Sequence, residues 1–314
     1  METIILEPAQ DFALQIDRFC KDRKLRGMTK ESIRRYKSSL IQFAECFHHA
    51  NLIDVNMEML KDFLGYLKDE RKVKHKTIEN NFTAISAFYD YLAFDCFNVK
   101  NLVLPFRKRY LRMYKTDYND PKKRLLTVEE LSQLANSILD PRDKAIVLVL
   151  AKTGVRRGEL LKMDVDDINW NEYSITLKPA AKRSNRIVYF DDECAIVLKR
   201  WLKVREQLNL TTKALFVSYQ TINRLSRNGA YQAVVKYARR LGFHNSTSPK
   251  LEDHFGPHCF RHWFTTWLLR NGMPREYVKE LRGDKRKEAI DIYHHIDKEE
   301  LRKTYLACIP KLGI

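Results

Sequence analysis

The stretch His258-Cys-Phe-Arg-His262 places two histidines and an arginine at positions i, i+3 and i+4. These positions share one side of a helix, so the spacing predicts that Arg261 and both histidines lie on a common polar face. Apolar residues such as Phe264 and Leu268 predict that the opposite face packs against a core. A planar guanidinium beside imidazoles suits a phosphate oxygen better than a protein interior. A surface helix that turns these groups to water is the alternative.

The composition points to a polyanionic partner. A chain of 314 residues predicts about two domains, because single cores usually stop at roughly 100–200 residues. Hydrophobic residues make up 44%, enough for proper cores, and the formal net charge is +17. A basic protein of this size usually binds nucleic acid. A membrane partner is not expected, because no apolar run approaches the roughly 20 residues of a spanning helix.

The cysteines and the first residues predict a cytoplasmic protein. Six cysteines are scattered without a C-x-x-C pair, which indicates buried or incidental thiols and neither a disulfide framework nor a zinc site. The N-terminal residues lack a basic segment followed by a small-residue cleavage site, so no signal peptide is expected. We expect no metal and no cofactor.

The first third of the chain predicts four amphipathic helices, which together could close one small bundle over residues 1–105. Thr29 is a plausible N-cap of the second helix. The four apolar faces consist of Phe12, Ile16, Phe19 and Cys20; of Ile33, Tyr36, Leu40, Phe43 and Phe47; of Leu60, Phe63, Leu64 and Leu67; and of Ile78, Phe82, Ile85, Tyr89 and Leu92.

Basic residues line the polar faces of these helices and continue into residues 106–124. Pro105 and Pro121 bracket this second segment and argue against one continuous helix, so we expect a basic linker. An ordinary solvated surface is the alternative, but the shared sign of the charge favours contact with a phosphate backbone. The residues expected to touch DNA are Arg34, Arg35, Lys74, Lys76, Arg107, Lys108 and Arg109, with His262 in the second domain.

A second domain is expected over residues 125–314. Residues 127–130 resemble a capping box, and an apolar helix over residues 145–151 ends before Gly154. Residues 173–178 and 185–190 predict two short strands joined by a basic turn. The predicted fold class is mainly α with a small β-hairpin or sheet. Further helices are expected over residues 195–208, 229–241, 258–271, 275–281, 288–294 and 299–307.

Four features of this second domain follow one another in a fixed order, although each alone has an ordinary structural explanation. They are the stretch from Thr153 through Arg156 to Leu160, the stretch from Lys178 through Lys182 to Arg186, the stretch His258-Cys-Phe-Arg261-His262, and the stretch Ile292-Tyr293-His-His-Ile-Asp297.

This order and spacing resemble the motifs of the tyrosine recombinase (integrase) family. The resemblance covers nearly the whole chain, and the N-terminal helices resemble, more weakly, the family's SAM-like core-binding domain. It implies catalytic arginines at Arg156 and Arg261, a catalytic lysine at Lys182 with Lys178 as second choice, a catalytic histidine at His258 and a nucleophile at Tyr293.

The resemblance also implies a mechanism. Two arginines would neutralise charge on the non-bridging oxygens of a scissile phosphate. Tyr293 would attack the phosphorus with help from His258, and Lys182 would protonate the departing 5′ oxygen. The product would be a 3′-phosphotyrosine, which a second strand can reverse without ATP or metal. His262 would support the site or hydrogen-bond locally.

Asp284 departs from the family pattern. The family usually has histidine or tryptophan nine residues before the tyrosine, and an ionised carboxylate cannot donate a hydrogen bond to phosphate. Asp284 could orient His258 or Arg261, or Lys285 or Arg282 could take over the donor role. Loss of activity is a further alternative.

The resemblance implies double-stranded DNA with specific recombination sites as the partner and a homotetramer on paired sites. Residues 304–310 could dock on a neighbouring subunit or pack on their own domain. A type IB topoisomerase-like nicking and closing enzyme and a catalytically impaired DNA-binding protein remain as alternative functions.

Overall fold

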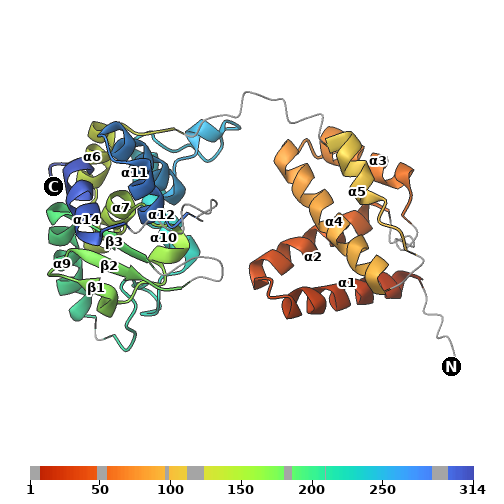
Figure 1. Cartoon of the computed structure of the whole chain (residues 1–314), viewed down its shortest axis with the longest axis horizontal. Helices are drawn as coiled ribbons and strands as arrows, with labels where there is room; N and C mark the ends of the chain where they lie inside the picture. The colour runs from red at the N-terminus through yellow and green to blue at the C-terminus, as the bar shows by residue number, and fades with distance from the viewer. Residues whose placement is uncertain are drawn as a thin grey trace. The chain divides into compact units, whose positions relative to one another are not determined.

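The computed structural model describes residues 8–47, 55–95, 99–111, 124–179, 186–208, 210–284 and 296–314. The chain divides into two compact units, Met1–Asp120 and Pro121–Ile314 (Figure 1). No helix of the described residues is long and apolar enough to cross a membrane.

The first unit is built of helices around an aromatic-rich core. The four predicted helices are confirmed, and Thr29 caps the second, because its Oγ1 accepts from the backbone N of Ser32 at 3.3 Å. Arg23 of the first helix donates to the carbonyl of Ala87 in the fourth at 2.7 Å. The elements are α1 (Pro8–Leu25), α2 (Lys30–Cys46), α3 (Met57–Gly65) with the π-helical turn η2 (Tyr66–Glu70), α4 (His75–Asp95), and α5 (Val103–Phe106) with the π-helical turn η3 (Arg107–Leu111).

The last two of these elements differ from the sequence expectation. Residues 106–111 were expected to begin a linker, but they are helical, and Phe106 and Leu111 are buried in the core of the first unit. Pro105 is the third residue of α5. The backbone N–H groups of a first helical turn have no partner within the helix, so a proline there removes no hydrogen bond.

The second unit contains a three-stranded antiparallel sheet of order β1-β2-β3. The predicted hairpin corresponds to β2 (Ser174–Leu177) and β3 (Arg186–Tyr189), in a register that pairs Ser174 with Tyr189 and Leu177 with Arg186. The strand β1 (Ile168–Asn169) was not predicted, because two residues are too few to show an alternating pattern.

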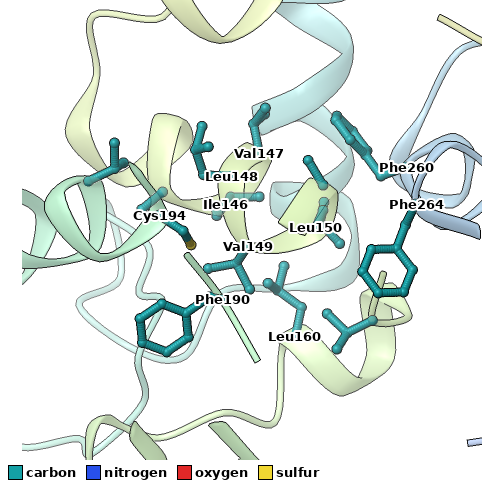
Figure 2. Close-up of a cluster of buried hydrophobic side chains, with 14 of the residues drawn as sticks. Ile146, Val147, Leu148, Val149, Leu150, Leu160, Phe190, Cys194, Phe260 and Phe264 are labelled. Atoms are coloured by element: carbon teal, nitrogen blue, oxygen red, sulfur yellow. The ribbon is translucent and has the colours of Figure 1, made fainter. Parts of the chain in front are cut away.

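Helix α7 (Pro141–Thr153) runs through the middle of the second unit (Figure 1). It extends the predicted helix at both ends, and all its residues from Ala145 to Thr153 are buried. Figure 2 shows its side chains between Phe190 and Cys194 on one side and Phe260 and Phe264 on the other. A helix that is buried all round needs partners on every face. Those partners include α6, α9, α10, α11 and β3.

The remaining helices of the second unit surround this centre. The capping box at the start of α6 is confirmed, with Thr127 and Glu130 as its two members. The helix expected over residues 288–294 lies outside the described residues. The helices are α6 (Val128–Asn136), α8 (Arg157–Leu160), α9 (Asp192–Glu206), α10 (Arg227–Arg240), α11 (Pro257–Arg270), α12 (Arg275–Arg282) and α14 (Lys298–Cys308), with 3-10 turns η5 (Val165–Asp167) and η6 (Leu251–Asp253).

The C-terminal segment packs on its own unit in this single chain. The hydroxyl of Tyr305 in α14 donates to the carbonyl of Lys152 at 2.8 Å. The buried Nζ of Lys152 donates to the carbonyl of Pro310 at 2.7 Å, and Glu193 accepts from the backbone N of Leu312 at 2.9 Å. Of the two alternatives for this segment, packing on its own domain is therefore the one that the structure contains.

Candidate active site

The first arginine motif begins where α7 ends. Gly154 closes the helix in the left-handed region, at φ 60°, where a side chain would be strained. A Cβ at this position would lie 2.3 Å from the ring of Phe264. The chain then passes through buried Val155 to Arg156, which precedes the short helix α8. The glycine therefore lets the arginine motif leave α7 directly against α11.

Arg156 is held at its backbone and at its side chain. Its backbone N donates to Oε2 of Glu159 at 2.7 Å, and its Nη1 lies 3.4 Å from Oε1 of the same carboxylate. Nη1 also donates to the carbonyl of Arg282 at 3.3 Å. The side chain is 27% exposed, so the guanidinium is fixed in position while part of it still reaches the surface.

The second arginine motif opens α11. The prediction that Arg261 shares a polar face with both histidines is wrong. His258 and His262 are exposed, with ring centroids 4.7 Å apart. Arg261 is buried, with only 4% of its side chain exposed. Position 261 lies about 100° around the helix from position 262, so it can turn inward while both histidines face out.

Arg261 finds its partners inside the unit. Nη1 donates to the carbonyl of Gly154 at 2.9 Å, and Nη2 donates to the carbonyl of Arg282 at 2.7 Å. Burial, together with the nearby positive charges of Arg156 and Arg282, lowers the pKa of Arg261 to about 10. The group stays charged at neutral pH, and a nearby anion stabilises it.

Asp284 supplies that anion. Its Oδ1 lies 3.2 Å from Nη2 of Arg261 and 3.6 Å from Nη2 of Arg156, and its Oδ2 lies 3.0 Å from Nε of Arg282. The sequence left open whether Asp284 orients His258 or Arg261, and the structure contains the contact with Arg261. The carboxylate stands between the two arginines that the family motifs single out.

The sequence reasoning missed two residues, Glu159 and Arg186. Arg186 begins β3 and points its guanidinium at Glu159, with Nη1 to Oε1 at 3.0 Å and Nη2 to Oε2 at 2.9 Å. Hydrogen bonds from Arg186 and Arg156 outweigh the effect of burial and lower the pKa of Glu159 to about 2. One signal was available: an arginine stands at a strand position whose strand neighbours are apolar.

The two lysine candidates differ in what the structure describes. Lys178 forms ion pairs with Asp164 and, at 3.5 Å, with Asp167. Lys182 and Tyr293 lie outside the described residues. The nearest described residues along the chain are Pro179 and Arg186 around Lys182, and Asp284 and Ile296 around Tyr293. Of these, Arg186 contacts Glu159, and Asp284 contacts both arginines.

Two of the residues expected to touch DNA lie on α2. Arg34 and Arg35 are exposed, and both pair with Glu31, at 3.1 and 3.6 Å. Exposed pairs of this kind contribute little to stability, so a phosphate could replace the carboxylate at small cost.

The others in the first unit lie near the start of α4 and on η3. Nε2 of His75 lies 3.2 Å from the carbonyl of Leu111, which brings the start of α4 to the end of η3. Arg107 is half-buried and donates to Oγ1 of Thr83 at 3.0 Å, so it also holds η3 on α4. The remaining predicted residues on the two segments, Lys74, Lys76, Lys108 and Arg109, are exposed.

Within the described residues, no group of three or more His, Cys, Asp or Glu side chains could hold a metal ion. The described contacts of the site join guanidinium and carboxylate groups to the carbonyls of Gly154 and Arg282.

The model of the phage integrase family matches residues 124–300, more than half of the chain. This chain belongs to the phage integrase family. A second model, the N-terminal SAM-like domain of phage integrases, matches residues 16–95. The chain therefore pairs the two domain types that the motifs implied.

The relatives of this integrase-family chain are tyrosine recombinases. Tyrosine recombinase XerC of Herpetosiphon aurantiacus is 29% identical over 88% of this chain and 89% of its own length. Among solved structures, XerH recombinase bound to palindromic difH in a post-cleavage complex covers 96% of this chain and 97% of its own, with a TM-score of 0.73 and 19% identity. A lambda integrase tetramer bound to a Holliday junction covers 89% and 80%, with a TM-score of 0.63 and 15% identity.

These matches confirm the expected recombinase fold and the expected enzyme class, so the chain is a tyrosine recombinase. They give no support to the topoisomerase-like alternative or to a catalytically impaired protein.

Proposed function

We propose that this protein cleaves and rejoins double-stranded DNA at specific sites through a 3′-phosphotyrosine intermediate. The observation that carries the proposal is the convergence of Arg156 and Arg261. Both donate to the carbonyl of Arg282, and both reach Oδ1 of Asp284 within 3.6 Å. Two guanidinium groups therefore meet at one position that already accommodates an anionic oxygen.

A scissile phosphate is the anion that this position suits in a DNA enzyme. Its two non-bridging oxygens carry the charge that grows as a fifth oxygen approaches phosphorus. Guanidinium groups held by Glu159 and by the carbonyl of Gly154 need little reorganisation when that charge develops. Preorganised donors of this kind are worth several orders of magnitude in rate.

We assign the covalent step to Tyr293. Its oxygen forms the new bond to phosphorus while the bond between phosphorus and the 5′ oxygen breaks. The tyrosine proton leaves to His258, which is exposed at the start of α11. Lys182 gives a proton to the departing 5′ oxygen. In the second half of the reaction a 5′ hydroxyl attacks the phosphotyrosine and the protons move in reverse.

We favour Lys182 over Lys178 as the general acid. Lys178 is engaged by two carboxylates at the base of the hairpin, so its ammonium is committed to Asp164 and Asp167. A general acid must reach the leaving group and release its proton there. Lys182 follows four residues later in the chain, between the end of β2 and the start of β3.

We assign Asp284 a role in orienting the arginine pair. Its carboxylate spaces two like charges that would otherwise repel each other. A phosphate that enters the site would share or take over the contacts of Oδ1. His262, beside His258 on α11, would support the histidine face.

We keep the expected division into residues 1–105, 106–124 and 125–314, except that the first domain would extend to Leu111. We propose that the helical domain binds DNA through Arg34, Arg35, Lys74, Lys76, Lys108 and Arg109, with Arg107 holding η3 in place. The linker would then begin after Leu111. A homotetramer on two paired sites and a cytoplasmic location complete the proposal, supported by the tetrameric lambda integrase among the similar folds and by the net charge of +17.

The test uses DNA that the protein itself selects. A duplex that the protein enriches from a randomised library is placed twice on one supercoiled plasmid. The proposal predicts deletion or inversion between the two copies, and binding that weakens steeply with salt. Relaxation of a plasmid without the selected site, and without recombinant products, would instead indicate a nicking and closing enzyme.

A further inference from the structure

Arg282 places a third guanidinium group at the arginine site. Its Nε lies 3.0 Å from Oδ2 of Asp284, and the other oxygen of that carboxylate faces Arg156 and Arg261. The positive charge of Arg282 is one of the causes, after burial and Arg156, that lower the pKa of Arg261 to about 10. One carboxylate therefore lies among three guanidinium groups, of which the proposed reaction uses two.

The backbone of Arg282 is fixed at the centre of the site. Its carbonyl accepts from Nη1 of Arg156 at 3.3 Å and from Nη2 of Arg261 at 2.7 Å. Arg282 is the last residue of α12, which Gly283 closes at φ 60°. A Cβ on Gly283 would lie 2.6 Å from Nη1 of Arg186, so only a glycine fits between this turn and the buried guanidinium. The root of the Arg282 side chain is consequently held beside both arginines of the family motifs.

The Arg282 side chain is more accessible than that of Arg261. It is 33% exposed, against 4% for Arg261, and its ion-pair partner Asp284 is 31% exposed. Ion pairs that are partly solvated are weak, so an entering phosphate can exchange for the carboxylate at small cost. Arg261 is fixed inside the unit, whereas the Arg282 guanidinium can adjust to a ligand at the surface.

The charges of the described site leave an excess of two positive charges. Arg186 and Glu159 neutralise each other through a two-bond fork, and Asp284 neutralises one of the three guanidinium groups around it. A phosphodiester carries one negative charge, and the addition of a phenolate oxygen to phosphorus raises this to two. Without Arg282 the excess would be one, which matches the ground state better than the transition state. A group that favours the transition state is one that accelerates the reaction.

We propose that Arg282 is a third catalytic arginine, whose guanidinium contacts a non-bridging oxygen of the scissile phosphate and neutralises the charge that grows there. This inference rests on the proposed function. Asp284 then acts on all three arginines, because its Oδ2 holds Nε of Arg282. An arginine held at Nε can still offer its two terminal nitrogens to a phosphate as a fork. Lysine supplies a charge without this fork.

The test changes the charge of the scissile phosphate. Single-turnover formation of the covalent adduct is measured on a nicked duplex of the selected site, and on the same duplex with a methylphosphonate at the scissile position. The methyl group replaces one non-bridging oxygen and removes its negative charge, and the two stereoisomers are separated and measured apart. The bonds that form and break at phosphorus are the same in all three duplexes.

We expect Arg282→Ala to cleave the phosphate duplex about 100-fold more slowly than the wild-type protein, because the loss of one preorganised donor costs about this much. One methylphosphonate isomer should rescue the variant, so that its ratio of methylphosphonate to phosphate cleavage rises about 100-fold above the wild-type ratio. Arg282→Gln should give the same rise. Arg282→Lys keeps a charge and loses the fork, so its ratio should rise by less than about 10-fold.

Arg275→Ala is the matched control. Arg275 is the first residue of α12, as Arg282 is the last, and its side chain is exposed. The substitution removes the same side chain from the opposite end of one helix. Its rate on the phosphate duplex and its ratio should both match those of the wild type.

The inference would be overturned by Arg282→Ala and Arg282→Gln variants that neither isomer rescues, or by variants as fast as the wild type on the phosphate duplex. Partial unfolding cannot imitate the predicted result, because it lowers the rates on all three duplexes by one factor. Either outcome leaves the proposed function intact, since the wild-type protein still forms the adduct. A wild-type protein that forms no adduct on the phosphate duplex contradicts the proposed function itself, and the inference with it.

Discussion

Oδ1 of Asp284 lies 3.2 Å from Nη2 of Arg261. The same oxygen lies 3.6 Å from Arg156. A carboxylate at this point satisfies two arginines in the absence of phosphate.

Removing the Asp284 carboxylate should slow cleavage. We expect Asp284→Ala to form the covalent adduct about tenfold more slowly, because the two guanidinium groups lose the group that orients them. Asp284→Asn keeps an oxygen that can accept from Arg261 and should stay within a few-fold of the wild type. Adduct formation on the nicked duplex measures both. An alanine variant as fast as the wild type would show that the carboxylate orients nothing.

Glu159 should make the second unit sensitive to acid. Its pKa falls from an ordinary 4.5 to about 2 on folding, so its contribution is complete above about pH 4.5 and is lost as the pH falls toward 2. The shift corresponds to at most about 3 kcal/mol. We expect Glu159→Gln to be less stable than the wild type at pH 7, and the gap to narrow as the pH is lowered.

Tryptophan fluorescence can follow this unfolding in denaturant, because all four tryptophans belong to the second unit. A gap that stays constant between pH 7 and pH 3 would mean that the ion pair with Arg186 does not account for the stability of this region.

Lys178 and Lys182 should respond differently to substitution. Lys182→Ala should slow cleavage of an ordinary nicked duplex of the selected site by about 100-fold or more. A duplex with a bridging 5′ sulfur at the scissile phosphate should restore most of the loss, because the sulfur leaves as a thiolate without needing a proton. Lys178→Ala removes an ion pair with Asp164 and should cost only a few-fold, equally on both duplexes. The reverse pattern would move the general acid to Lys178.

Two glycines offer a matched pair for the packing of the arginine motif. Both Gly154 and Gly242 have positive φ, but a Cβ at Gly154 would meet the ring of Phe264 at 2.3 Å, whereas a Cβ at Gly242 would meet nothing within 4 Å. We expect Gly242→Ala to cost about 1 kcal/mol through backbone strain alone. Gly154→Ala should cost about 3 kcal/mol, because overpacking adds to the strain. Equal losses in thermal or denaturant unfolding would contradict the contact.

Local signals in the sequence predicted local structure well. The capping box at Thr127, the helix end at Gly154 and the alternation of the β2–β3 hairpin all depend on neighbours within a few residues. The order of the family motifs predicted which catalytic residues to seek, and Arg156 and Arg261 do come together.

The partners of those residues could not be predicted in the same way. Arg261 was expected on a face with His258, but it turns inward because its acceptors are the carbonyls of Gly154 and Arg282, which only the tertiary fold brings to α11. Arg186 donates to the carbonyl of Leu281, 95 residues away in the chain. Helical and strand periodicity contain no information about such contacts.

The most direct test of the account is the identity of the residue that becomes attached to DNA. The wild-type protein is incubated with the nicked duplex of its selected site, the denatured adduct is digested, and the peptide that carries the nucleotide is identified by mass spectrometry. The account predicts a peptide modified at Tyr293, and no adduct from Tyr293→Phe. An adduct at another residue, or one that persists in Tyr293→Phe, would contradict it.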